Sequence, residues 1–156
     1  MEQECSRPIR RRLMEFRPVT QGVGALIYSK QTQRYLFLLR QGGSWPDTWA
    51  LPGGKIDRGE TVIIGLAREI EEELGGRILD PKLIPIERYT SSDQRFVYHT
   101  FFVSVDDEFV PLLNDEHSGY AWLPLSSAPK PLHPGISRTL ASPSVMRKIH
   151  VAEACS

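Results

Sequence analysis

The sequence lacks several features that would assign it to a special class of protein. It has only two cysteines, Cys5 and Cys155, each near one end of the chain. Two cysteines so placed exclude a disulfide framework and a cysteine zinc site, and they predict reduced thiols in a cytoplasmic protein. No apolar run approaches the roughly 18 residues that a transmembrane helix needs, so no membrane partner is expected.

The chain also lacks an excess of charge of either sign. Its 19 Lys and Arg residues balance 19 Asp and Glu residues, so there is no strong signal for nucleic-acid binding. The local exception is the basic N-terminal segment, residues 1–17, with three successive arginines at 10–12. No apolar stretch follows it, so we predict a loosely attached arm rather than a signal peptide. Contact of these arginines with phosphates or lipid is the alternative.

An apolar content of 40% over 156 residues is typical of one soluble domain, which we place at residues 18–156. β-rich runs and amphipathic stretches alternate along it. The first two strands, and later the fourth and fifth, are predicted to form hairpins, the first hairpin at the centre of the sheet. This order predicts an α/β (α+β) fold, an α/β/α sandwich with a mixed central β-sheet. The predicted strands are 19–29, 35–40, 49–51, 83–89, 95–105 and 120–123, and the predicted helices are 61–74, 136–141 and 144–152.

The segment 53–76 carries the strongest pattern. It is typical of a tight glycine turn, a connector and a helix that contains four clustered glutamates. Apolar side chains of this helix fall within about 100° of arc, which predicts that they face the core. These apolar residues are Ile63, Leu66, Ala67, Ile70 and Leu74.

Three of the glutamates, Glu69, Glu72 and Glu73, share a second arc beside the apolar one, and Arg68 can pair with Glu72 along the helix. Carboxylates gathered in this way repel each other and weaken an isolated helix, whereas a bound divalent cation reverses that effect. Carboxylate oxygens suit Mg²⁺, with Mn²⁺ as the second choice. The alternative is a solvated acidic face on a surface helix.

The spacing of these residues resembles the Nudix box of the MutT-like Nudix hydrolase family. Five residues separate the first glycine of the pattern from its first glutamate, and seven separate that glutamate from an Arg-Glu pair. One departure is Gly76, at a position that the family usually fills with an aliphatic residue. The matching residues, within a box at 54–76, are Gly54, Glu60, Arg68, Glu69, Glu72, Glu73 and Gly75.

This resemblance implies the Nudix fold and a Mg²⁺-dependent site. It assigns Glu72 and Glu73 as metal ligands, with Glu72 also in a catalytic role, and Glu69 as a ligand or catalytic base. Arg68 is implied to orient the carboxylates of the box, and the Gly53 carbonyl is a candidate ligand. Pyrophosphate hydrolysis needs a polarised phosphate and a deprotonated water, and one helical face of carboxylates can serve both tasks.

A further acidic residue outside the box is expected from the same resemblance, because MutT-like members carry one at a similar spacing. Glu116 is our candidate for this additional ligand or base, and the alternative is an exposed loop glutamate. The adjacent His117 is a candidate base or substrate contact. His133, in a loop between Leu132 and Pro134, is a candidate for the pocket wall.

Candidates for substrate contacts lie before the box. Arg40 could bind phosphates or pair on the surface, and Trp45 could stack on a base or pack in the core. Phe96 and Tyr98 could project from a facing strand in the same way.

The sequence therefore predicts a metal-dependent pyrophosphohydrolase that cleaves a nucleoside diphosphate linked to another moiety. Nucleoside triphosphates rank first as substrates, and nucleotide sugars, including ADP-ribose, rank second. A faint resemblance at 115–123 leaves a GDP-mannose-type hydrolase open, and a non-catalytic nucleotide- or ADP-ribose-binding domain is the other alternative. An isopentenyl-diphosphate isomerase would need a central cysteine, which this chain lacks. Family members often dimerise, so a homodimer is also open.

Overall fold

The computed structural model describes residues 18–76, 78 and 82–156. The predicted basic arm, residues 1–17, lies outside these described residues. None of the helices described is long and apolar enough to cross a membrane. The strands are β1 (Thr20–Ser29), β2 (Arg34–Arg40), β3 (Trp49–Ala50), β4 (Gly53–Lys55), β5 (Ile84–Thr90), β6 (Phe96–Val105) and β7 (His117–Leu123). The helices are α1 (Val62–Leu74), α2 (Pro134–Ala141) and α3 (Pro143–Ala154), with a 3-10 turn at Leu125–Ser127.

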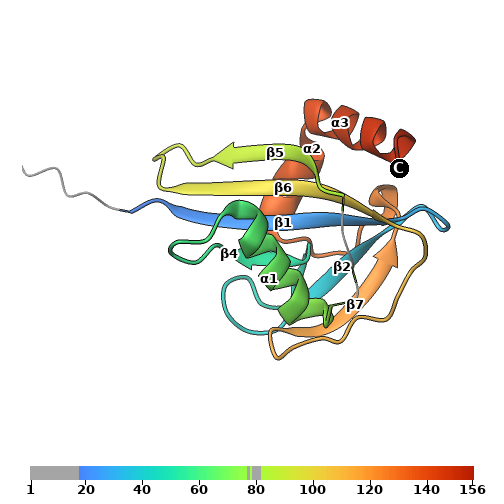
Figure 1. Ribbon diagram of the computed structural model, residues 1–156, viewed down its shortest axis with the longest axis horizontal. Helices are drawn as coiled ribbons and strands as arrows, with labels where there is room; N and C mark the ends of the chain where they lie inside the picture. The colour runs from blue at the N-terminus through green and yellow to red at the C-terminus, as the bar shows by residue number, and fades with distance from the viewer. Residues whose placement is uncertain (1–17, 77, 79–81) are drawn as a thin grey trace, which may run out of the picture.

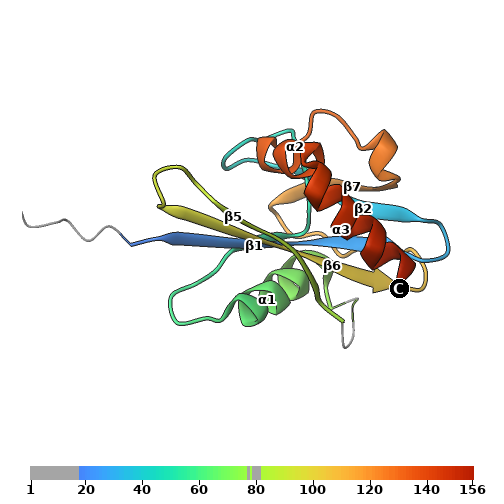
Figure 2. The same cartoon turned by 90° about the horizontal axis from the view of Figure 1, so that it is seen from above.

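The strands form one mixed sheet with β1 at its centre (Figure 1). The main path runs β3-β2-β1-β6-β5, while β4 pairs with β1 and β7 pairs with β2. β1 is parallel to β6 and antiparallel to β2 and β4. Helix α1 covers one face of the sheet, and α2 and α3 cover the other (Figure 2). The predicted layering of helices on both sides of a mixed central sheet is confirmed.

Side chains of β1 alternate between two cores, as the two-residue period of a strand requires. Val23, Ala25 and Ile27 are fully buried in the core beneath α1. Leu26 and Tyr28 are buried in the core beneath α2 and α3. The central strand therefore connects the two layers and fixes the position of α1 relative to the sheet.

One edge of β1 is shared by two successive partners. β2 pairs with it only next to their turn, at Tyr28–Tyr35 and Ser29–Arg34, so the predicted central hairpin is confirmed only there. Farther along, residues 22–24 of β1 pair with β4. The prediction of a tight turn at Gly53 was wrong, because Gly53–Lys55 forms this strand. The predicted second hairpin is confirmed by the antiparallel pairing of β5 with β6.

Both ends of α1 are capped by side-chain or backbone contacts. The Thr61 hydroxyl accepts a hydrogen bond from the Ile64 N–H at 3.2 Å. At the other end Gly75 adopts a left-handed conformation and its N–H donates to the Glu71 carbonyl. Gly76 is also left-handed, and a Cβ there would lie 2.6 Å from the Glu71 carboxylate. An aliphatic side chain would be strained at this position, so glycine at the end of the box suits the local backbone.

The buried face of α1 differs from the predicted apolar arc. Ile63 is 48% exposed and Ala67 is exposed, so the prediction was wrong at these two positions. Glu69 and Glu73 are instead buried, at 7% and 1% exposed, beside Leu66, Ile70 and Leu74. The helix is turned so that two carboxylates face the sheet, where β4 and Arg68 supply polar partners.

Candidate metal and substrate site

Strand β4 holds the two buried carboxylates of α1. The Gly53 N–H donates a hydrogen bond to Glu73 Oε2 at 2.7 Å. A Cβ on Gly54 would lie 2.5 Å from the Glu69 carboxyl carbon, so only glycine leaves room for that carboxylate. The two glycines thus permit a close approach of strand and helix. The Gly53 carbonyl remains a predicted ligand on a residue in direct contact with Glu73.

Arg68 connects the carboxylates of the box to each other and to the backbone. Its Nε donates to Glu60 Oε1 at 2.7 Å, and its Nη1 donates to Glu69 Oε1 at 2.9 Å and to Glu72 Oε2 at 3.4 Å. Its Nη2 donates to the Lys55 carbonyl at 2.8 Å. Hydrogen bonds from Arg68 and from the Asp57 N–H lower the pKa of Glu60 to about 2. These contacts are the geometry expected of a residue that orients carboxylates.

Glu73, Glu116 and His117 converge from two elements. Ligand atoms of these three side chains all lie within 4.8 Å of one another. Glu73 comes from α1, whereas His117 begins β7 and Glu116 precedes it. Glu116 is exposed and His117 is buried. The sequence prediction placed Glu116 near the box, and the structure brings it to Glu73, while Glu72 is outside this group and its side chain is 52% exposed.

Burial disfavours the charged forms of Glu69, Glu73 and His117. The pKa of Glu73 is raised to about 8, mainly by burial and also by the nearby Glu69 and Glu116 carboxylates, which together outweigh the lowering hydrogen bond from Gly53. Burial also raises the pKa of Glu69. Burial and Arg40 lower the pKa of His117 to about 4. Although His117 Nε2 lies 3.7 Å from Glu73 Oε1, both shifts oppose an ion pair, so near neutral pH a neutral imidazole faces a largely protonated carboxyl group.

We expect Mg²⁺ binding to tighten as the pH rises towards 8. A proton must leave Glu73 before its carboxylate can bind a cation, since the pKa of Glu73 is raised to about 8. Below that pH the apparent association constant should rise by up to about tenfold per pH unit, and above it the dependence should level off. Calorimetric titration with Mg²⁺ across this range measures the slope. In Glu73→Gln the Mg²⁺ association constant should depend less steeply on pH. The same pH dependence in both proteins would contradict the assignment of Glu73 as the group that loses the proton.

A pocket of about 170 Å³ adjoins the carboxylates, between β4, β6 and the start of α2. Its charged lining residues are arginines, Arg40 and Arg138, and Gly53 and Gly54 form part of its wall. Arg40 also lines a second hollow of about 230 Å³ that includes Glu116. Arg40 therefore lines both the pocket and the hollow that contains Glu116.

Two polar residues of the pocket are held in fixed orientations. The Arg138 guanidinium lies 3.3 Å from the centroid of the Tyr89 ring, a cation–π contact. His133 Nδ1 accepts a hydrogen bond from the Gly135 N–H at 3.1 Å, which leaves Nε2 as the donor of the neutral ring. The pKa of His133 is lowered by burial and by the two arginines. Both side chains line the pocket and carry hydrogen-bond donors.

Tyr98 reaches the pocket across β1 because two residues there have no side chain. A Cβ on Gly22 would lie 2.7 Å from the Tyr98 ring, and a Cβ on Gly24 would meet its hydroxyl. Tyr98 and Phe96 both line the pocket and their rings lie 6.1 Å apart. The glycines of β1 therefore open a place for an aromatic wall.

The sequence identified some of these pocket residues and missed others. Arg40 and His133, both candidates from the sequence, line the pocket, whereas Trp45 is 55% exposed and is not among the lining residues. Trp45 meets the His133 ring edge-on, with centroids 6.2 Å apart. Arg138 was missed altogether. Its only signal in the sequence was its place five residues after a predicted pocket histidine. Using that signal required knowing where α2 begins.

The sequence model of the NUDIX domain matches residues 18–142. Among curated proteins, the chain is 39% identical over 87 residues to the 8-oxo-(d)GTP phosphatase of Mycolicibacterium smegmatis, covering 53% of this chain and 25% of that one. It is 30% identical over 116 residues to the nucleoside triphosphatase NudI of Escherichia coli O139:H28, covering 68% of this chain and 77% of that one. The chain spans a quarter of the mycobacterial relative and 64% of a NudI from Salmonella typhimurium.

Solved structures agree with the fold. A MutT NUDIX hydrolase from Burkholderia pseudomallei aligns with a TM-score of 0.63 and 28% identity, over 78% of this chain and 95% of that one. A MutT protein from Methanosarcina mazei Go1 aligns with a TM-score of 0.65 and 25% identity, over 88% of this chain and 97% of that one.

Proposed function

Because this chain belongs to the NUDIX domain family, we propose that it hydrolyses a phosphoric anhydride in a nucleoside diphosphate derivative. The observation that carries the proposal is the convergence of Glu73, Glu116 and His117 beside an arginine-lined pocket. Buried acids that are costly to ionise, next to cationic side chains, suit a site for a metal and a phosphate together.

The residues present fit a hard divalent cation such as Mg²⁺, with Mn²⁺ as an alternative. Carboxylate oxygens and a backbone carbonyl are the donors that such an ion prefers. Glu73, Glu72, Glu69 and Glu116 would hold it, with the carbonyl of Gly53. When bound, the ion would neutralise phosphate charge and acidify a water molecule. The raised pKa values of Glu69 and Glu73 would fall once a cation neutralises the group.

The chain's own side chains would position the substrate and accept a proton. Arg68 keeps Glu69 in place through a 2.9 Å hydrogen bond. Glu116 is exposed and forms no ion pair among residues 18–76, 78 and 82–156, so its carboxylate is open to water and can act as the base. Glu69 is the other candidate. The neutral ring of His117 would orient the neighbouring carboxylates of Glu73 and Glu116.

Two arginines flank the place of the substrate. Arg40, beside Glu116, would bind a phosphate, and Arg138 and His133 would donate to acceptor atoms farther along the substrate. Tyr98 and Phe96 would supply an apolar wall for a base or a sugar. Trp45, at the mouth beside His133, would contact only the outer part of a substrate.

Nucleoside triphosphates are the first substrate class to test, since two relatives carry the names nucleoside triphosphatase and 8-oxo-(d)GTP phosphatase. Nucleotide sugars, including ADP-ribose, come second. Purified protein with Mg²⁺ should convert triphosphates to monophosphate and pyrophosphate, and chelation should stop the reaction. Glu116→Gln should lower the rate, with Asp115→Asn, its exposed neighbour, as the control. The proposal would be refuted if no nucleoside triphosphate and no nucleotide sugar were hydrolysed with either Mg²⁺ or Mn²⁺.

A further inference from the structure

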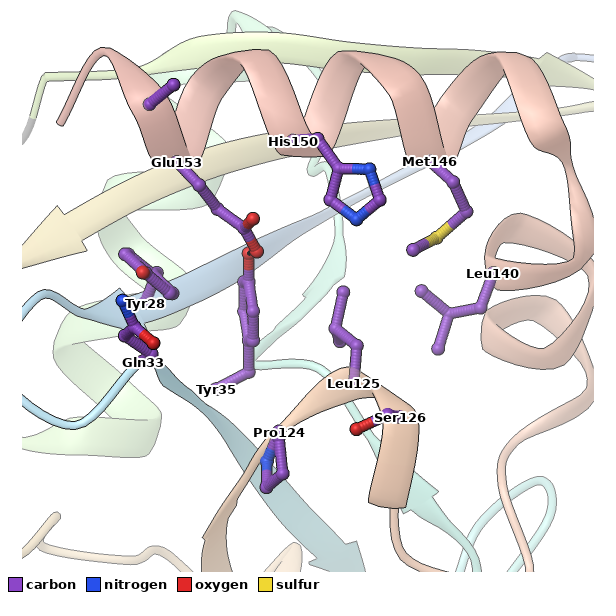
Figure 3. Close-up of a pocket in the computed structure, with 11 residues that line it drawn as sticks. Tyr28, Gln33, Tyr35, Pro124, Leu125, Ser126, Leu140, Met146, His150 and Glu153 are labelled. Carbon is purple, nitrogen blue, oxygen red and sulfur yellow. Dashed lines mark hydrogen bonds between the residues drawn. The ribbon is translucent and has the colours of Figure 1, made fainter.

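A large pocket lies away from the carboxylates, on the face of the sheet that α3 covers. Its volume is about 600 Å³, within the usual range for small-molecule sites. The end of β1, the start of β2, the 3-10 turn and helices α2 and α3 all contribute to its wall (Figure 3). No residue that lines it also lines the arginine-lined pocket or belongs to the carboxylate group. It is a second, separate cavity.

A carboxylate held by a tyrosine gives this pocket its charge. The Tyr35 hydroxyl donates to Glu153 Oε1 at 2.5 Å. Burial and Glu153 raise the pKa of Tyr35 well above its usual range, so the phenol keeps its proton and remains a donor. Among the described residues that line the pocket, only Glu153 carries a formal charge. No lysine or arginine in this part of the chain forms an ion pair with it. Within residues 18–76, 78 and 82–156, its carboxylate therefore has no lysine or arginine as counter-ion.

The rest of the wall combines acceptors with an apolar surface. Met146, His150 and Glu153 follow one face of α3 at the i, i+4 and i+7 spacing, and all three point into the pocket in Figure 3. Tyr28, Gln33 and Ser126 add oxygen atoms that accept hydrogen bonds, and Leu125 and Leu140 add hydrocarbon. In Figure 3, Tyr28 and Gln33 lie on the same side of the pocket as Glu153, whereas Leu140 and Met146 lie on the other side.

We propose that this pocket binds a small organic cation, a primary or secondary alkylammonium. The ammonium group meets Glu153 and donates to the neighbouring oxygens, and the hydrocarbon body packs on Leu140 and Met146. Charge-assisted hydrogen bonds between an ammonium and a carboxylate are stronger than neutral ones. An anion such as a nucleotide is repelled by Glu153 and finds no arginine or lysine among the described residues of the wall. One carboxylate is too few ligands for a bare metal ion.

Three ligands with the same hydrocarbon chain test the charge requirement on the unmodified protein: hexylammonium chloride, 1-hexanol and sodium hexanoate. Calorimetry gives the affinities, and the methyl resonance of Met146 reports the site. Hexylammonium should saturate this signal below about 10 mM, with hexanol at least about tenfold weaker and hexanoate weaker still. Equal binding of the alcohol and the ammonium, or no saturable shift with the ammonium, would overturn the proposal.

A matched pair of variants then tests whether the negative charge of Glu153 is the one that binds the ammonium group. Glu153→Gln keeps the size of the side chain and an acceptor for the Tyr35 hydroxyl, but removes the negative charge. It should weaken hexylammonium binding at least about tenfold, whereas Glu71→Gln, on the exposed side of α1, should leave it unchanged. An unaltered affinity in folded Glu153→Gln would also reject the proposal. No nucleotide enters these measurements, so their outcome is independent of the activity proposed for the other face.

Discussion

Glu73→Gln is expected to lower kcat/KM by about a thousandfold or more while leaving the protein folded. Glu73 is the carboxylate of α1 that touches the Gly53 amide and meets Glu116 and His117. The role proposed for Glu73 is that of a metal ligand. Loss of a metal ligand removes several kcal/mol of transition-state stabilisation, and every 1.4 kcal/mol is about tenfold in rate. Steady-state hydrolysis of the best substrate, with saturating Mg²⁺, measures the loss.

The fold should survive this substitution. Glutamine resembles the protonated acid that prevails near neutral pH, where the pKa of Glu73 is about 8, and its amide oxygen can still accept from Gly53. Without metal the melting temperature should therefore be equal or higher. Glu71→Gln is the control because Glu71 is exposed on the same helix, and it should change kcat/KM less than about twofold. Equal effects of the two substitutions on kcat/KM would contradict the assignment of Glu73 to the active site.

Gly53→Ala is expected to destabilise the protein by more than about 3 kcal/mol. Gly53 has a φ of 144°, and a Cβ there would lie 2.1 Å from the Val23 carbonyl oxygen and 2.5 Å from the Gly24 Cα. Both atoms belong to the backbone of the central strand, which cannot move without disturbing the two cores. Strand β4 would be displaced instead, and the hydrogen bond from Gly53 to Glu73 would be lost. Urea unfolding measures the change.

Gly59→Ala separates steric conflict from backbone strain. Gly59 has a φ of 88°, but no atom lies within 4 Å of a Cβ added there. Gly59→Ala should lower the free energy of unfolding by only about 1 kcal/mol, the usual cost of a left-handed backbone for an alanine. If the two alanine variants lost the same stability, the close packing of β4 on β1 would not be the reason.

The sequence predicted the position of α1 better than its orientation. The repeat of apolar residues and the glycines after Leu74 located the helix to within a residue of its observed start. The buried face was wrong at Ile63 and Ala67 because glutamates are normally placed on the solvent side. Glu69 and Glu73 are buried here because the glycines of β4 approach them closely, a contact between segments that a local pattern does not contain.

Contacts between segments distant in the sequence explain the other features that the sequence did not predict. Gly53–Lys55 has the composition of a turn, and only its register with residues 22–24 of β1 makes it a strand. Arg138 reaches the candidate site through the packing of α2 across the sheet. Glu116, by contrast, was found from its resemblance to the additional acid of MutT-like proteins, and the structure places it at Glu73.

Equilibrium binding of Mn²⁺, followed by electron paramagnetic resonance, tests most directly whether these carboxylates form one cation site. The wild-type protein, Glu73→Gln, Glu116→Gln and the control Glu71→Gln would be titrated at the same pH. Wild type and the control should bind with the same affinity, and each of the other two should bind at least about tenfold more weakly. Unchanged Mn²⁺ affinity in Glu73→Gln, or no Mn²⁺ binding by the wild type, would contradict a metal site at this place.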